Sequence, residues 1–178
     1  MITELGHYAL ILALATALVQ SLVPLIGAQR GDAGMMAVGP MAANISFVLV
    51  AFSFLTLTYA YVISDFSLLN VVENSHSMKP MIYKITGVWG NHEGSMLLWV
   101  LILVIFSTLV ATFGRNLPDT LRANVLSVQA WITVAFLLFI LLTSNPFIRL
   151  SNAPAEGNDL NPLLQDPGLA FHPPFLYL

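Results

Sequence analysis

The chain has 178 residues, of which 57% are hydrophobic and only 8% are charged, and its formal net charge is −3. Soluble globular domains contain about 25% charged residues, so this composition excludes an ordinary soluble domain and indicates a membrane protein. The small net charge gives no indication of nucleic-acid binding. The sequence contains no cysteine, which excludes disulfides, iron–sulfur ligation and thiol catalysis by these residues.

Four long uncharged runs follow one another along the chain. They cover residues 5–26, 41–63, 95–113 and 125–143. Each is long enough to cross a hydrocarbon core of about 30 Å as a helix of about 20 residues. A fifth apolar run begins at Pro173 and continues to the last residue given. We therefore expect an all-α, polytopic membrane bundle with four complete transmembrane helices and the start of a fifth, as a fragment of a longer membrane protein.

The connections between these runs alternate in length. Residues 27–40 and 114–124 form short connections, whereas residues 64–94 and 144–172 form long ones. Four spans place the N-terminus and both long connections on one side of the membrane. Lysines and arginines are divided equally, three to each side, so the positive-inside rule does not set the orientation. Long connections translocate readily, which favours external loops at 64–94 and 144–172.

The histidines show a second pattern. All four lie at the N-terminus or in the long connections, and hence on one predicted face of the membrane; they are His7, His76, His92 and His172. None lies at the centre of a span. The four predicted spans therefore cannot by themselves supply a bis-histidine site for a haem at mid-membrane.

His172 is the first candidate ligand. A neutral imidazole binds metals and serves as an axial ligand to haem iron. Pro173 and Pro174 suit the start of a helix, so we expect His172 near an N-cap, where the helix dipole disfavours imidazolium and keeps a nitrogen lone pair available. The alternative is a capping or interfacial histidine bonded to a carbonyl group, and the residues alone leave both interpretations open.

A second candidate motif runs from Trp89 to Ser95 and leads into the third apolar run. Glu93 and Ser95 suit a helix N-terminus, by charge and by capping respectively. In a functional interpretation, His92 and Glu93 handle a proton or surround the propionate of a cofactor. In a structural interpretation, the motif is a capped helix start anchored by an aromatic ring.

Four stretches of this sequence resemble the N-terminal part of the CcmF-type haem lyases of system I cytochrome c maturation, which implies that residues 1–178 are the N-terminal transmembrane portion of a longer membrane protein. The stretches are RGDAGMM (30–36), WGNHEGSMLLW (89–99), FILLTSNPF (139–147) and DLNPLLQDPGLAFHPP (159–174). A related family that serves nitrite reductase maturation has a similar pattern. The resemblance extends over all 178 residues and is carried most specifically by the last two stretches.

The resemblance implies a multi-pass protein of the bacterial inner membrane with a periplasmic N-terminus. Its periplasm-facing site receives haem b, as substrate, from the haem chaperone CcmE. The haem is then attached covalently to apocytochrome c, which CcmH/CcmI-type chaperones present. The histidine of the family's His-Pro-Pro motif maps onto His172 and implies an axial ligand to the haem iron, with Trp89, His92 and Glu93 near that site; no catalytic residue is assigned.

The resemblance also implies parts that lie beyond these residues. A tryptophan-rich loop, a second external histidine and the transmembrane histidines that bind a structural haem b all come later in such proteins. We therefore expect these residues alone to be inactive, although the full-length family member is an enzyme. Two alternatives differ in class: a segment of an ion-coupled transporter with His92 and Glu93 at a gate, or a structural anchor in which His172 only caps a helix. No predicted span carries a mid-membrane ionisable residue, which argues against the transporter.

Overall fold

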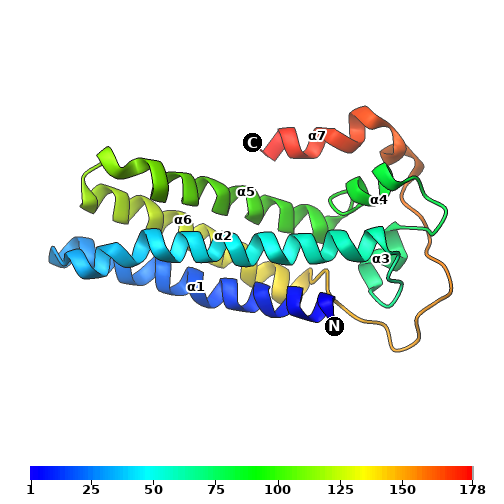
Figure 1. Cartoon of the computed structure of the whole chain (residues 1–178), viewed down its shortest axis with the longest axis horizontal. Helices are drawn as coiled ribbons and strands as arrows, with labels where there is room; N and C mark the ends of the chain where they lie inside the picture. Colours follow the sequence, from blue (N-terminus) through cyan, green and yellow to red (C-terminus); the bar gives the residue numbers. More distant parts are fainter. Residues whose placement is uncertain (178) are drawn as a thin grey trace. The chain divides into compact units, whose positions relative to one another are not determined.

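The computed structural model describes residues 1–177, and its elements are helices (Figure 1). In chain order they are α1 (Ile2–Arg30), α2 (Ala33–Val62), α3 (Leu69–Asn74), α4 (Met81–Gly87), α5 (His92–Phe113), η1 (Gly114–Asn116), α6 (Asp119–Thr143), η2 (Pro162–Gln165) and α7 (Pro167–Tyr177). Over the described residues, pairing of the β type is limited to one isolated bridge between Leu68 and Arg149. The predicted all-α class is confirmed.

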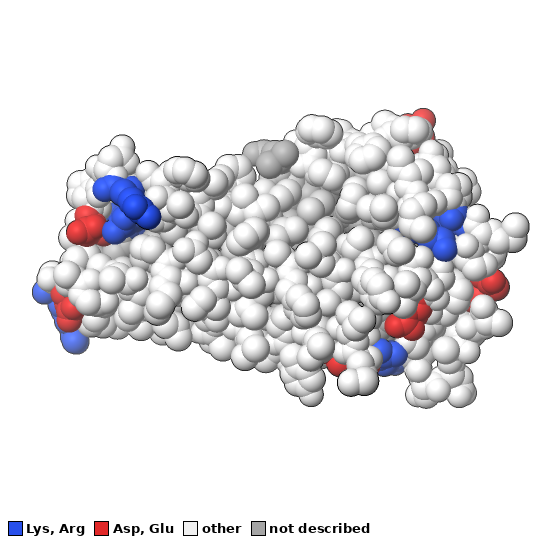
Figure 2. All heavy atoms as spheres, viewed as in Figure 1, with Lys and Arg blue, Asp and Glu red and all other residues white. Residues whose placement is uncertain are grey.

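Four helices are long and apolar enough to cross a membrane: α1, α2, α5 with η1, and α6. The charged residues of these helices lie in their first and last turns, and the others lie in the connections and short helices. On the face drawn in Figure 2, the charged atoms gather in small patches and most of the surface is uncharged. This is the arrangement of a multi-pass membrane protein.

The first connection is much shorter than the predicted loop at residues 27–40. Helix α1 continues to Arg30 and α2 begins at Ala33. Gly31 adopts a left-handed φ of +69°, as glycine commonly does after a helix, and Asp32 Oδ1 accepts a 3.1 Å hydrogen bond from the N–H of Met35. A glycine stop followed by an Asp cap therefore turns the chain within two residues.

Helices α5 and α6 also begin before their apolar runs. Helix α5 starts at His92 rather than residue 95, because Asn91 Oδ1 caps it by accepting the N–H of Gly94 at 2.8 Å. Helix α6 starts at Asp119, directly after Pro118, rather than at residue 125. Polar first turns are helical as well, because backbone hydrogen bonds do not depend on side-chain polarity.

The last helix corrects a prediction about His172. Helix α7 starts at Pro167, not at Pro173, so His172 lies inside the helix rather than near its N-cap. The helix begins here because Asp166 is its N-cap and Pro167 its first residue. Asp166 Oδ1 accepts the N–H of Leu169 at 3.1 Å, and proline suits the first helical position. His172 is therefore the sixth residue of α7, beyond the first turn in which the helix dipole acts on a side chain.

The chain divides into two units. Unit 2 comprises residues 8–51 and 100–139. It contains most of α1 and α6, the first part of α2 and the last part of α5. Within it, Gln20 Nε2 donates hydrogen bonds of 3.1 Å to Ser107 Oγ and to the carbonyl of Leu126, as expected for a polar residue that joins membrane helices. Leu126 is fully buried and packs in a cluster with two small residues, Ala43 and Ala111.

Unit 1 comprises residues 1–7 and 52–99, and the described chain from residue 140 onward. It contains α3, α4, η2, α7 and the adjoining ends of the long helices. All four histidines of the sequence belong to this unit. The candidate site is therefore built from unit 1 alone.

Candidate functional site

Helix α7 is held at two points within unit 1. Near its middle, the indole Nε1–H of Trp89 donates a 2.8 Å hydrogen bond to the carbonyl of Ala170. Near its end, the ring of Tyr177 meets the ring of Trp99 edge-on, with centroids 5.3 Å apart. The indole of Trp89 is in turn stacked on Phe54 of α2, with centroids 6.4 Å apart and planes 15° apart. His172 lies between the two attachment points.

The imidazole of His172 is exposed. Among residues 1–177, no side chain or backbone group forms a hydrogen bond or ion pair with it. Leu169, Phe175 and Leu176, three or four positions away along the helix, are 47%, 75% and 66% exposed. The result is a free imidazole on an apolar helix face, which suits an apolar, planar metal complex.

The described residues contain no group of three or more His, Cys, Asp or Glu side chains that could hold a metal ion. His172 can therefore offer a single bond to a metal whose other ligands come from elsewhere. A porphyrin iron meets this condition, because the macrocycle supplies the four equatorial nitrogens. The single imidazole of His172 therefore fits an axial ligand to haem iron. The described side chains do not form a complete metal site of their own.

Glu93 belongs to a chain of polar side chains at the start of α5. Its Oε2 accepts a 3.1 Å hydrogen bond from Asn70 Nδ2, and Asn70 Oδ1 accepts a 2.6 Å bond from the hydroxyl of Tyr61. Asn91 Nδ2 donates to the same hydroxyl at 3.0 Å. Tyr61 is fully buried and Asn70 is 4% exposed. Sequence reasoning identified Glu93 but missed Tyr61 and Asn70, because Tyr61 lies within a predicted apolar span and Asn70 within a predicted connection, where neither stands out.

A cavity of about 40 Å³ adjoins this network. Its polar lining includes the carboxylates of Glu73 and Glu93 and the amides of Asn70 and Asn145. A space of this size holds a few water molecules. Glu93 therefore lines a volume that can hold water, and the volume is too small for an organic cofactor.

Two other histidines meet consecutive residues at the end of α6. His92 Nε2 lies 3.1 Å from Ser144 Oγ, and His7 Nε2 lies 3.1 Å from Asn145 Nδ2. His7 is also stacked on Phe147, with ring centroids 6.0 Å apart. These two imidazoles therefore tie α1 and α5 to the segment that follows α6.

The long connections are joined by charged and polar side chains. Glu156 accepts hydrogen bonds from the hydroxyl and N–H of Ser77, at 2.6 and 3.2 Å, and these bonds lower the pKa of its carboxyl. His76 Nε2 lies 3.6 Å from the same carboxylate. Lys79 is buried, and burial lowers its pKa to about 8, against the raising effect of Asp159 nearby. The segment that leads to α7 is therefore anchored to the first long connection.

The predicted site residues are thus only partly brought together by direct contact. Trp89 bonds to the helix that carries His172, whereas His92 contacts Ser144 after α6 and Glu93 contacts Asn70 of α3. His76 lies in the loop contact with Glu156. Trp89 is the predicted residue with the most direct link to His172.

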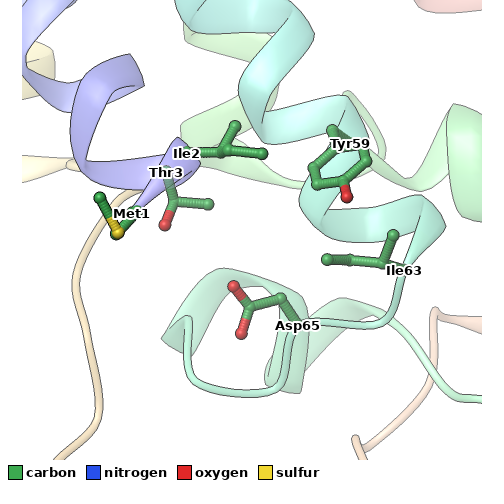
Figure 3. Close-up of a pocket in the computed structure, with 6 residues that line it drawn as sticks. All are labelled: Met1, Ile2, Thr3, Tyr59, Ile63 and Asp65. Carbon is green, nitrogen blue, oxygen red and sulfur yellow. The ribbon is translucent and has the colours of Figure 1, made fainter.

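A separate groove of about 260 Å³ lies between the start of α1 and the end of α2 in unit 1 (Figure 3). It is lined by Met1, Ile2, Thr3, Tyr59, Ile63 and Asp65. Asp65 is its one acidic side chain, and its Oδ1 already accepts the N–H and hydroxyl of Ser67, at 3.2 and 2.5 Å. This groove contains none of the predicted site residues.

Comparison with known proteins identifies the family. The sequence model described as "Cytochrome C assembly protein" matches residues 89–178, which is half of the chain. The chain belongs to the cytochrome c assembly protein family. The matched region includes the motif at Trp89, the helix α7 and His172.

Individual members of the cytochrome c assembly family cover the rest of the chain as well. "Cytochrome c-type biogenesis protein CycK" of Rhizobium meliloti (strain 1021) is 70% identical over all 178 residues, which are 26% of its own length. "Cytochrome c-type biogenesis protein CcmF" of Pseudomonas aeruginosa PAO1 is 54% identical over the whole chain and 27% of its own length. The chain thus spans about a quarter of the length of these relatives.

A solved structure agrees with both sequence comparisons. The structure titled "Cytochrome c Heme Lyase CcmF" matches 85% of this chain and 26% of its own chain, with a TM-score of 0.79 and 28% sequence identity. The fold of this family therefore agrees with the helices described above, and the resemblance to CcmF-type proteins is confirmed.

Proposed function

We propose that this chain contributes one axial haem ligand and part of the membrane scaffold to a cytochrome c haem lyase. The observation that carries the proposal is the exposed imidazole of His172, which has no partner within residues 1–177 and is flanked by exposed apolar side chains. A histidine that served only as a helix cap or a packing residue would be bonded or buried. Membership of the cytochrome c assembly family supports haem as the occupant.

In this function His172 binds the iron of haem b through one imidazole nitrogen. Leu169 and Leu176 shield the porphyrin edge from water on the same helix face. The cysteine thiols of the apocytochrome then add across the haem vinyl groups. Each sulfur bonds to one vinyl carbon, the thiol hydrogen goes to the other, and no electrons are gained or lost. The residues described here hold and orient the substrate haem, and the thiols come from the partner, because this chain has no cysteine.

The proposed arrangement places unit 1, with all four histidines, on the periplasmic side of the bacterial inner membrane. The N-terminus is periplasmic and residues 1–178 form the N-terminal portion of a longer protein. CcmE delivers the haem and CcmH/CcmI-type chaperones present apocytochrome c. The second axial ligand, and the ligands of a structural haem b, belong to the remainder of that protein.

The proposal is tested in the full-length protein by His172→Ala. We expect the purified variant to lose most of the absorbance of the external haem and to mature cytochrome c at least about tenfold less well, since removal of a ligand removes a direct bond to the substrate. His76→Ala is the matched control, because it removes an imidazole from the same unit. Unchanged haem occupancy and normal cytochrome c maturation in the His172→Ala protein would contradict the ligand assignment.

A further inference from the structure

The sequence of α7 creates one carbonyl group that its own helix cannot satisfy. A helical carbonyl accepts the N–H four residues later in an α-helix, or three residues later in a 3₁₀ turn. For Ala170 these positions are Pro174 and Pro173, and neither has an N–H. Both ordinary donors are therefore absent for this one carbonyl, on the turn that carries His172.

The position of Ala170 makes the missing donors consequential. Ala170 is 5% exposed and is the buried residue of α7. A buried carbonyl without a hydrogen-bond partner destabilises the conformation that buries it. A double proline next to a ligand would therefore loosen the helix unless a donor came from another element.

Trp89 supplies that donor. Its Nε1–H reaches the Ala170 carbonyl at 2.8 Å, a distance typical of a good N–H···O hydrogen bond. Its ring is stacked on Phe54, and its backbone N–H bonds to the carbonyl of Thr86 at 3.3 Å at the end of α4. The donor is thus held in place before it meets α7.

We infer that Trp89 is the positioning residue for His172: its indole N–H replaces the helical donor removed by Pro173 and Pro174, and so fixes the turn that presents the imidazole. Trp89 acts through the backbone of α7 and need not touch haem. The inference rests on the proposed function for the identity of the ligand that His172 binds. Its structural half, the fixing of α7 by Trp89, can be measured without haem.

The first test measures amide hydrogen exchange in the haem-free full-length protein. Trp89→Phe keeps a ring to stack on Phe54 but removes the N–H donor. We expect exchange of the α7 amides at residues 170–172 and 175–177 to become about fivefold to tenfold faster, the effect of losing one hydrogen bond. Trp131→Phe is the matched control, because it removes an indole N–H in unit 2. Unchanged exchange in Trp89→Phe overturns the inference.

The second test restores the helical donor that Pro174 removes. Pro174→Ala restores an N–H four residues after Ala170, so α7 can satisfy the carbonyl itself. In the Pro174→Ala background, Trp89→Phe should change α7 exchange less than about twofold, within the range expected of a substitution that no longer removes a needed bond. An equally large effect in both backgrounds overturns the inference, because Trp89 would then act by packing alone.

The third readout is the spectrum of haem bound to the full-length protein. We expect Trp89→Phe to shift the haem absorbance part of the way from wild type towards His172→Ala, and the Trp89→Phe/Pro174→Ala protein to match Pro174→Ala alone. Faster exchange with a wild-type spectrum overturns the positioning of the ligand. If His172→Ala itself has a wild-type spectrum, the proposed ligand fails, and the exchange data still decide whether Trp89 fixes α7.

Discussion

The ammonium group of Lys79 lies 3.8 Å from Asp159 Oδ1 and donates a 2.7 Å hydrogen bond to the carbonyl of Asn74, with its side chain fully buried. Asp159 precedes η2 and has a left-handed φ of +70°, which is uncommon for a residue other than glycine. A buried cation thus links the first long connection to the segment that leads into α7.

The burial of Lys79 predicts an unusual titration for its ammonium group. Burial lowers its pKa from the ordinary value of 10.5 to about 8. We expect NMR of isotope-labelled lysine, assigned with Lys79→Gln, to show a midpoint near pH 8. Asp159→Asn should move the midpoint lower still, because the carboxylate favours the charged form. A midpoint near the ordinary value would contradict the buried environment.

The same shift predicts how stability depends on pH. Between about pH 8 and 10.5 the unfolded chain keeps the Lys79 proton that the folded protein has released, so the unfolded state binds more protons. The contribution of this group to the free energy of unfolding should therefore rise with pH across that window. Chemical denaturation in detergent at pH 7.5 and 10 should show a change in the free energy of unfolding that is more favourable in wild type than in Lys79→Met, and the difference between the two is the contribution of Lys79.

Asn91 is predicted to be important for the start of α5. It accepts the N–H of Gly94 and donates to the buried hydroxyl of Tyr61. We expect Asn91→Ala to lower the free energy of unfolding by about 2 kcal/mol, through loss of a helix cap and of a buried hydrogen bond. Asn116→Ala, at an exposed position in η1, is the control and should change stability by less than about 0.5 kcal/mol.

Gly94 is predicted to tolerate no side chain. A Cβ atom there would lie 1.6 Å from the carbonyl oxygen of Val88. Because that oxygen belongs to the backbone, Gly94→Ala should force the link between α4 and α5 to move and cost about 3 kcal/mol in thermal or chemical unfolding. Gly34→Ala is the comparison: its Cβ would lie 3.2 Å from the movable Asp32 carboxylate, so the change should stay within about 1 kcal/mol. Equal effects of the two substitutions would contradict a steric clash with the Val88 carbonyl as the cause.

The orientation in the membrane can be measured with single cysteines, because residues 1–178 contain none. Met78→Cys places a thiol at an 87% exposed position in the long connection, and Asn116→Cys places one in the short connection. In the full-length protein cleared of other reactive cysteines, a membrane-impermeant maleimide should label residue 78 from the periplasm. Residue 116 should react only after the membrane is opened. The reverse pattern would contradict the periplasmic N-terminus.

Sequence patterns predicted the number and order of the long helices better than their ends. Apolar runs indicate where lipid surrounds a helix, whereas a helix ends where capping residues stop its hydrogen bonds. Asp32 and Asn91 are such caps, and each lies outside the run that it serves. The helix start at Asp166-Pro167 was missed because His172-Pro173 is also a polar residue followed by proline, and the sequence does not show which of the two begins the helix.

Composition and spacing by themselves determined the membrane class, the four spans and the grouping of the histidines, because burial in lipid demands long uncharged stretches that a sequence displays directly. The motif at residues 159–174 also identified His172 as the candidate ligand. Only the tertiary structure decided that His172 lies inside a helix, that Trp89 bonds to the Ala170 carbonyl, and that Glu93 meets Asn70 and, through it, Tyr61. These contacts join residues 9 to 81 positions apart, and local patterns do not specify which distant donor meets which acceptor.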